Sequence, residues 1–389
     1  MKKRDNYLAF GTPNFTDAEI DAVTRVMRSG WVGMGPETLA FETELADYLG
    51  APEVVTVNSC TSALFLALLA EDIGPGDEVI VPSLTWCATA NAVLYLGATP
   101  VFCDVDSLTM CVTEASVVAK LTPRTKAVIA VHYGGYAVDV EALRQALPAY
   151  VAIIEDAAHA LGATYPDGRH VGASGNSVCF SFYANKNLST ADGGAIALFD
   201  KDKAERLRSL RMSGMSSNAW SRYTNPSSSV MQGLTELGYK MNYTDLQAAI
   251  GRVQLKRMDE MAAARQQVAE HYQYRLAEKG LAIEFQSKVF NAGHARHLLV
   301  CRIDQEYTGE HRDALFLKLR AQNIGVSIHY RPLHIQPLYC KDVVITLPNT
   351  DYLADCIMTL PISAQMTLDD VDYVVDNLAD LIMKCREAI

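Results

Sequence analysis

A single lysine stands among small and hydroxyl-bearing residues in the segment SFYANKNLSTADGGA, residues 181–195. The segment follows a run of apolar residues that is typical of a buried strand. A loop lysine is most often a solvated surface side chain. That interpretation applies to Lys186 unless other motifs of the chain supply partners for the amine.

Two acids mark the end of another apolar run. The segment VAIIEDAAHA places Glu155 and Asp156 at the end of an expected strand, and His159 follows three residues later. A carboxylate at the end of a central strand is costly to bury unless it meets a cation or several hydrogen-bond donors. We therefore expect a positive group beside this pair.

Two further motifs follow expected strands. In NSCTSAL, a strand runs into a helix, so Cys60, Thr61 and Ser62 place backbone amides and hydroxyls at the positive end of that helix. Such an end can bind an anion, although it can equally be a plain helix cap. In PSLTWCATAN, Trp86 either packs in the core or offers a flat stacking surface.

Pyridoxal 5'-phosphate requires all four of these features. Its phosphate binds a helix N-terminus, its ring nitrogen pairs with a carboxylate, its ring face stacks on an aromatic side chain, and its aldehyde bonds an amine. The glycine-rich motifs of nicotinamide-binding proteins and of nucleoside triphosphatases are absent from the sequence. A Cys60 nucleophile paired with His132 is conceivable, but no spacing supports it.

The elements that would position these residues alternate between strand and helix from Val54 to about Phe199. This alternation predicts an α/β domain with a mainly parallel sheet, in which ligands lie beyond the carboxyl ends of the strands. The chain then becomes helical, with a long helix expected around Leu246–Leu276, and a smaller α+β domain follows.

The expected domain division runs through that helix. Residues 1–255 would form the large domain and residues 256–389 the small one, with residues 1–30 joining the small domain or the substrate side. The segment 213–234 is rich in serine, asparagine and glycine, so we expect a long loop that is mobile until something binds.

Composition narrows the class of protein. The chain has 389 residues, 49% of them hydrophobic, which suits a large core, and a net charge of -11 argues against nucleic acid and anionic membranes as partners. No apolar segment has the length of a signal peptide core or a membrane span, so we expect a cytoplasmic protein. Nine scattered cysteines predict neither a metal site nor a disulfide framework.

Five motifs, in order and spacing, resemble those of the sugar aminotransferases of the DegT/StrS type. The resemblance covers nearly the whole chain. It implies fold type I of the pyridoxal phosphate enzymes, which is similar to aspartate aminotransferase, and a homodimer whose active sites lie at the subunit interface. Within the family, PSLTW, EDAAHA and LPNT are most similar to the enzyme that makes 4-amino-4-deoxyarabinose on a uridine nucleotide.

The resemblance also implies roles for particular residues. Lys186 would be the Schiff-base lysine, Asp156 the partner of the pyridinium nitrogen, Trp86 the stacking surface, and His159 a neighbour of the phenolic oxygen. The phosphate would be held by short polar side chains, namely Thr61, Ser62, Ser181 and the partner subunit's Asn242. Expected on the substrate side are Trp31, Lys240, His329 and Arg331.

The sequence departs from the family pattern at two places. Cys60 replaces a glycine of the phosphate turn, and Lys240 and Met241 precede Asn242 where many members have Asn-x-Arg. The implied reaction is transamination, with L-glutamate as amino donor and a nucleotide-linked 4-keto sugar for lipopolysaccharide or another surface polysaccharide as acceptor. Three alternatives stay open: a keto sugar acid without a nucleotide, such as an oxidised octulosonate; a pyridoxal phosphate-dependent sugar dehydratase; and a non-catalytic regulatory homologue.

Overall fold

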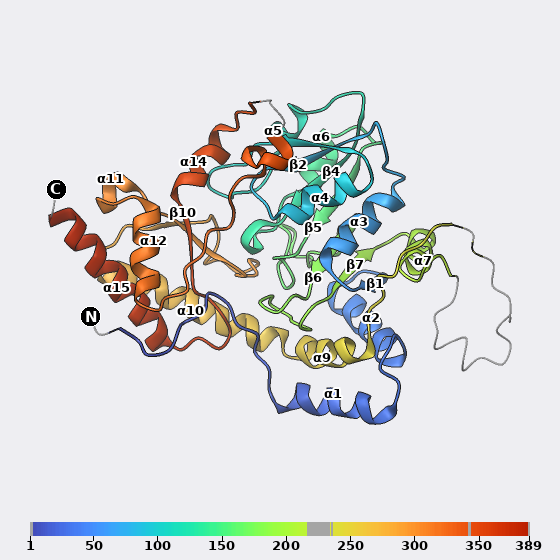
Figure 1. Cartoon of the computed structure of the whole chain (residues 1–389), viewed down its shortest axis with the longest axis horizontal. Helices are drawn as coiled ribbons and strands as arrows, with labels where there is room; N and C mark the ends of the chain where they lie inside the picture. The colour runs from blue at the N-terminus through green and yellow to red at the C-terminus, as the bar shows by residue number, and fades with distance from the viewer. Residues whose placement is uncertain (1–2, 216–233, 235, 341–343, 388–389) are drawn as a thin grey trace.

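The computed structural model describes residues 3–215, 234, 236–340 and 344–387 (Figure 1). Most of the segment 213–234 lies outside these residues. The strands of the two sheets are β1 Glu53–Val57, β2 Glu78–Pro82, β3 Thr99–Cys103, β4 Thr125–Val131, β5 Ala152–Asp156, β6 Ser177–Ser181, β7 Gly194–Leu198, β8 Glu284–Phe285, β9 Leu299–Arg302 and β10 Ile357–Leu360.

Helices join these strands and cover the sheets. The α-helices are α1 Asp17–Ser29, α2 Pro36–Leu49, α3 Cys60–Ala70, α4 Cys87–Tyr95, α5 Glu114–Val118, α6 Val140–Ala146, α7 Lys201–Leu210, α9 Asp245–Lys256, α10 Met258–Glu278, α11 Gln305–Thr308, α12 Arg312–Ala321, α13 Pro337–Cys340, α14 Pro348–Cys356 and α15 Leu368–Glu387. Two short 3-10 helices are η1 Tyr133–Gly135 and η2 Leu333–Ile335.

The larger sheet has the strand order β1-β7-β6-β5-β4-β2-β3. Strands β6, β5, β4, β2 and β3 pair in parallel, and β7 runs antiparallel to both of its neighbours. Strands β2, β6 and β7 are buried along their whole length, as expected where helices cover both faces of a sheet. The predicted mainly parallel α/β fold is therefore confirmed.

Helix α3 lies at the centre of this arrangement. It contacts β5, β6 and β7, and nearly all of its side chains are buried, so its apolar residues do not form a single stripe. The side chain of Ser59 caps its first turn by accepting the N–H of Ser62. The helix therefore begins beside the ends of the central strands.

A second hydrophobic core surrounds the smaller antiparallel sheet, whose order is β10-β9-β8. Its apolar residues come mainly from α10, α12, α15 and the three strands. The amino-terminal segment also belongs here, because Leu8 pairs with Ile324 and the carbonyl of Phe10 accepts the N–H of Ile362. The proposed domain division at residue 255 stays a prediction.

The single long helix expected around Leu246–Leu276 is instead two helices, α9 and α10. The break falls at Arg257, whose backbone leaves the helical conformation, and whose guanidinium bonds Glu19, Glu260 and the carbonyl of Asn14. Helix α9 packs on α1 and α2, whereas α10 continues into the second core (Figure 1). The two ends of the expected helix thus serve different neighbours.

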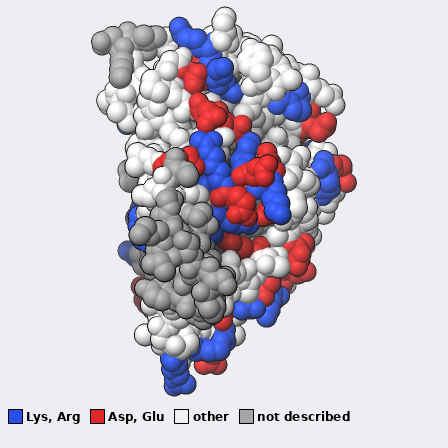
Figure 2. Space-filling view, turned by 90° about the vertical axis from the view of Figure 1, so that its right-hand side faces the viewer, with Lys and Arg blue, Asp and Glu red and all other residues white. Residues whose placement is uncertain are grey.

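Acidic and basic side chains are interspersed on the face at the right of Figure 1, as Figure 2 shows. Helix α7 on that side carries Arg206, which pairs with Asp72 and Glu236, and Arg208, which pairs with Glu53. Because charges of both signs are paired there, this part of the surface has no extended positive or negative potential. Among the described residues, no helix has both the length and the apolar character needed to cross a bilayer.

Candidate active site

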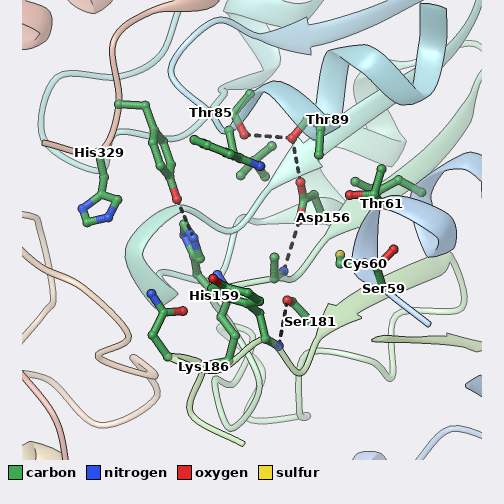
Figure 3. A pocket seen from close by; sticks show the side chains of 18 of the residues that line it. Ser59, Cys60, Thr61, Thr85, Thr89, Asp156, His159, Ser181, Lys186 and His329 are labelled. Carbon is green, nitrogen blue, oxygen red and sulfur yellow. Dashed lines mark hydrogen bonds between the residues drawn. The ribbon is translucent and has the colours of Figure 1, made fainter. Parts of the chain in front are cut away.

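A cavity of about 520 Å³ lies at the carboxyl ends of the central strands. It brings together residues that are far apart in the sequence. Seven of the residues expected in the site line it: Thr61, Trp86, Asp156, His159, Ser181, Lys186 and His329. In Figure 3, Lys186 and His159 lie on one side of Asp156, and the start of α3 lies on the other.

Asp156 ends β5 and is buried, with 5% of its surface exposed. Its Oδ2 accepts the hydroxyl of Thr89 at 2.8 Å, and its Oδ1 accepts the N–H of Ala158 at 3.1 Å (Figure 3). Thr85 lies 3.0 Å from Thr89 and donates to it, since the one hydroxyl hydrogen of Thr89 is directed at Asp156. Burial raises the pKa of Asp156, and these hydrogen bonds offset part of that rise.

Glu155, the residue before it, points away from the cavity. It is fully buried and accepts hydrogen bonds from Tyr165 at 2.6 Å, from Asn176 at 2.8 Å and from Ser174. His132 Nε2 lies 2.8 Å from it, and His132 Nδ1 accepts the N–H of Val138. Both nitrogens of His132 are thus engaged, which leaves none for the conceivable pairing with Cys60.

Lys186 sits in the loop that joins the antiparallel strands β6 and β7, so both ends of its loop are fixed by the sheet. Its Nζ lies 3.3 Å from Nε2 of His297, a residue just before β9 of the second core. Burial lowers the pKa of the Lys186 amine to about 8, against a smaller raising effect of Cys60 and Asp156. The protonated amine therefore still predominates at physiological pH, but the neutral form is far more populated than for an exposed lysine.

The start of α3 forms the opposite end of the cavity. Ser59, Cys60 and Thr61 line it, and the N–H groups of Cys60 and Thr61 belong to the first turn, where a helix offers no internal acceptor. Gly194 lets this turn approach, because a Cβ there would lie 2.7 Å from both the Cys60 nitrogen and the Phe180 carbonyl oxygen. Burial raises the pKa of the Cys60 thiol well above its usual value, so it stays protonated.

Aromatic and imidazole rings line the other side of the cavity. His159 Nδ1 accepts the N–H of Gly134 at 3.2 Å, and its Nε2 lies 3.1 Å from the hydroxyl of Tyr330. Trp86 contacts Tyr330 and keeps 59% of its surface exposed, so it is not a core residue. His329 bonds Thr359, and burial, with the charge of Lys186, lowers the pKa of His329 to about 3.

Five residues expected in the site do not line this cavity. The hydroxyl of Ser62 instead donates to the side-chain oxygen of Asn58, the residue after β1, at 2.6 Å. The other four residues lie outside the cavity as well. Lys240 and Arg331 are exposed. The side chain of Asn242 donates to the carbonyl of Tyr243, and that of Trp31 donates to the carbonyl of Met34.

Several residues in or beside the cavity were not predicted from the sequence, among them Thr85, Thr89, His297 and Tyr330. Thr85 and Thr89 flank Trp86 at helical spacing, and Tyr330 adjoins His329, so a closer inspection of those motifs could have found them. His297 is separated from Lys186 by 111 positions and lies just before β9 of the smaller sheet. No local signal marks it.

Comparisons with known proteins show the family of the chain. The model of the DegT/DnrJ/EryC1/StrS aminotransferase family matches residues 13–379. Spore coat polysaccharide biosynthesis protein SpsC of Bacillus subtilis is 41% identical, with 98% of this chain and 99% of SpsC covered.

Two solved structures are similar over nearly the whole chain. The sugar aminotransferase Spr1654 of Streptococcus pneumoniae in its PLP form has a TM-score of 0.88 at 28% identity, covering 97% of this chain and 99% of its own. DesI in the presence of its TDP-sugar product has a TM-score of 0.88 at 28% identity, covering 99% of this chain and 95% of its own.

Proposed function

Because the chain belongs to the DegT/DnrJ/EryC1/StrS aminotransferase family, we propose that it transfers the amino group of L-glutamate to a keto sugar. The observation that carries the proposal is the placement of Asp156 and Lys186 in one cavity, with the start of α3 at its other end (Figure 3). These groups suit the ring nitrogen, the aldehyde and the phosphate of one cofactor.

That cofactor is pyridoxal 5'-phosphate, as the sequence predicts and as the PLP form of Spr1654 supports. The donor set of the cavity fits it. A buried carboxylate with a raised pKa calls for a proton or a cation beside it, which a pyridinium nitrogen supplies. The free amides of Cys60 and Thr61, with the hydroxyls of Thr61 and Ser181, suit a phosphate.

When bound, the cofactor supplies an electron sink that stabilises a carbanion at the substrate carbon. Asp156 would hold the proton on the ring nitrogen, and Thr89 and the Ala158 amide keep its carboxylate in place. A charge-assisted hydrogen bond of this kind contributes about 1.5–3 kcal/mol. Lys186, with its pKa near 8, takes and returns the proton at Nζ, a role that contributes roughly 10²- to 10⁴-fold in rate.

The acceptor is a nucleotide-linked 4-keto sugar destined for a surface polysaccharide. Two observations support this class: SpsC is named for spore coat polysaccharide biosynthesis, and the DesI structure was obtained with a TDP-sugar product. The motif similarity to the 4-amino-4-deoxyarabinose enzyme, and with it a lipopolysaccharide product, stays a prediction. So do His329 as a substrate contact within the cavity and Trp31, Lys240 and Arg331 outside it.

The site is completed by a second copy of the chain. Asn242 lies outside the cavity of its own chain, next to the buried Tyr243, which is compatible with its expected reach toward the phosphate of the other subunit. The nine cysteines are free thiols, which suits an enzyme that works in the cytoplasm beside glutamate and nucleotide sugars.

Incubation with L-glutamate and a panel of keto sugars tests this function. Formation of 2-oxoglutarate with each accepted sugar supports transamination, and the panel should contain nucleotide-linked 4-keto sugars and nucleotide-free keto sugar acids. Sugar turnover without any amino donor would identify a dehydratase instead. If the protein shows no turnover and binds no cofactor, it is a non-catalytic homologue.

A further inference from the structure

His297 lies buried beside the amine of Lys186, with 5% of its surface exposed. Its Nε2 is 3.3 Å from Nζ, and its Nδ1 is buried without a hydrogen-bond partner among the described residues. Within that part of the chain, the lysine is thus the polar contact of this ring. Buried polar groups are normally hydrogen-bonded, so a buried ring with one such contact calls for an explanation, and the contact with Lys186 offers one.

The groups around the ring favour its neutral form. The nearest is Lys186, then His159, whose ring centroid lies 4.7 Å away, and Arg265 and His329 act from farther off. All of these are cations or imidazoles. Burial and these charges hold the pKa of His297 well below its usual value. The ring therefore stays neutral wherever the enzyme works, with one nitrogen that accepts a hydrogen bond.

A lysine ammonium has three donors and no acceptor, so the nitrogen that faces it must accept. We propose that His297 is a positioning residue for the transamination proposed above: its Nε2 accepts a hydrogen bond from Nζ of Lys186 whenever that amine is free. The bond directs Nζ toward the cavity and favours its protonated form, which strengthens Lys186 as the base. The contact also links the loop after β6 of the larger sheet to the segment before β9 of the smaller sheet.

Two replacements of similar polarity separate positioning from packing. In His297→Gln, the amide oxygen reaches about as far as Nε2, whereas in His297→Asn it is one methylene short. We expect His297→Asn to lower kcat about 10- to 100-fold with KM changed less than about threefold, as a displaced catalytic group does. His297→Gln should restore most of the rate. His294→Gln is a matched control, since His294 is equally buried but bonds Gln286 and the Arg296 amide.

A second measurement needs neither cofactor nor substrate. The apo-protein is treated with trinitrobenzenesulfonate across a pH series, and the labelling of Lys186 is followed by peptide mass spectrometry. We expect the pH midpoint of Lys186 labelling, near pH 8 in the unaltered protein, to fall by about one unit in His297→Asn. The midpoint should stay unchanged in His297→Gln and His294→Gln.

Equal behaviour of His297→Asn and His297→Gln in both measurements would overturn the proposal, as would a failure of both variants to fold, because either result indicates a packing role. Failure of the proposed function has a different signature. The unaltered protein would then form no 2-oxoglutarate from glutamate, while the labelling midpoints of Lys186 would still report on the contact with His297.

Discussion

Glu155 and Asp156 are consecutive residues of β5, yet the pKa of Glu155 lies below its usual value and that of Asp156 above it. Burial raises both pKa values. Glu155 points to the far face of the sheet, where hydrogen bonds from His132, Ser174 and Tyr165 more than offset its burial. Asp156 faces the cavity with fewer donors, so it retains an unmet demand for a cationic partner. Successive side chains of a strand point to opposite faces, so Glu155 has a structural role and Asp156 faces the reaction site.

Replacing each acid by its amide should separate these roles. Asp156→Asn removes the charge that holds the proton on the cofactor nitrogen, so we expect the rate of 2-oxoglutarate formation to fall about 10- to 100-fold. Glu155→Gln should instead lower the free energy of unfolding by about 1–3 kcal/mol, measured by urea unfolding, with the activity of the folded protein retained. Equal activity of Asp156→Asn and the unaltered protein would mean that another group protonates the ring.

Lys186→Ala should abolish transamination and the visible absorbance of the lysine-bound cofactor, because no other amine is placed to form that bond in the described cavity. Absorption spectra and 2-oxoglutarate assays of the purified variant measure both. Lys256→Ala, at an exposed lysine near the end of α9, is the control and should behave as the unaltered protein does. Retention of absorbance and turnover in Lys186→Ala would refute the assignment.

The same lysine should make the apo-protein less stable at neutral pH. Its pKa falls from 10.5 in the unfolded chain to about 8 in the folded one, so between these values the unfolded chain binds the extra proton. The free energy of unfolding therefore rises with pH across this window. Lys186→Met should stabilise the apo-protein by up to about 3 kcal/mol at about pH 7, and by almost nothing above about pH 10. Urea unfolding at both pH values measures the difference, and a pH-independent gain would contradict the lowered pKa.

Gly194→Ala should disturb the anion-binding end of the cavity. The added Cβ would meet backbone atoms of Ser59, Cys60 and Phe180 at 2.7 Å, so the first turn of α3 must move. We expect a loss of about 1–3 kcal/mol in the free energy of unfolding, as in other overpacked cores, and weaker binding of pyridoxal 5'-phosphate measured by fluorescence titration. At Gly74, a Cβ has no neighbour within 4 Å, so Gly74→Ala should leave both values unchanged.

Much of the fold and half of the site follow from the order of strands and the residues after them. Asp156, Ser181 and Trp86 each stand at or just past the carboxyl end of a parallel strand, and such ends meet at one edge of a sheet. This rule is local in sequence, which is why it worked. The expectation of a single helix around Leu246–Leu276 was wrong. The whole segment has helix-forming sequence, and the break results from packing against two different cores, which the local sequence does not show.

The remaining residues depend on orientation and on long-range packing. Ser62 is one position after Thr61, and a rotation of about 100° along the helix turns its hydroxyl from the cavity to Asn58. His297 reaches Lys186 only because the segment before β9 packs into the first core, to which Ala295 and Leu298 belong. Neither relationship is encoded in a short motif, so neither could be predicted from the sequence.

The path of the amino-terminal segment has a practical consequence. Its carbonyl groups and side chains join the second core at Leu8, its Phe10 ring stands 5.2 Å from that of His329, and α1 then packs on α9 beside the first core. The amino-terminal segment therefore contacts both cores and packs behind His329, a residue that lines the cavity. Truncating this segment, or fusing a bulky tag close to it, should lower catalytic activity as well as solubility.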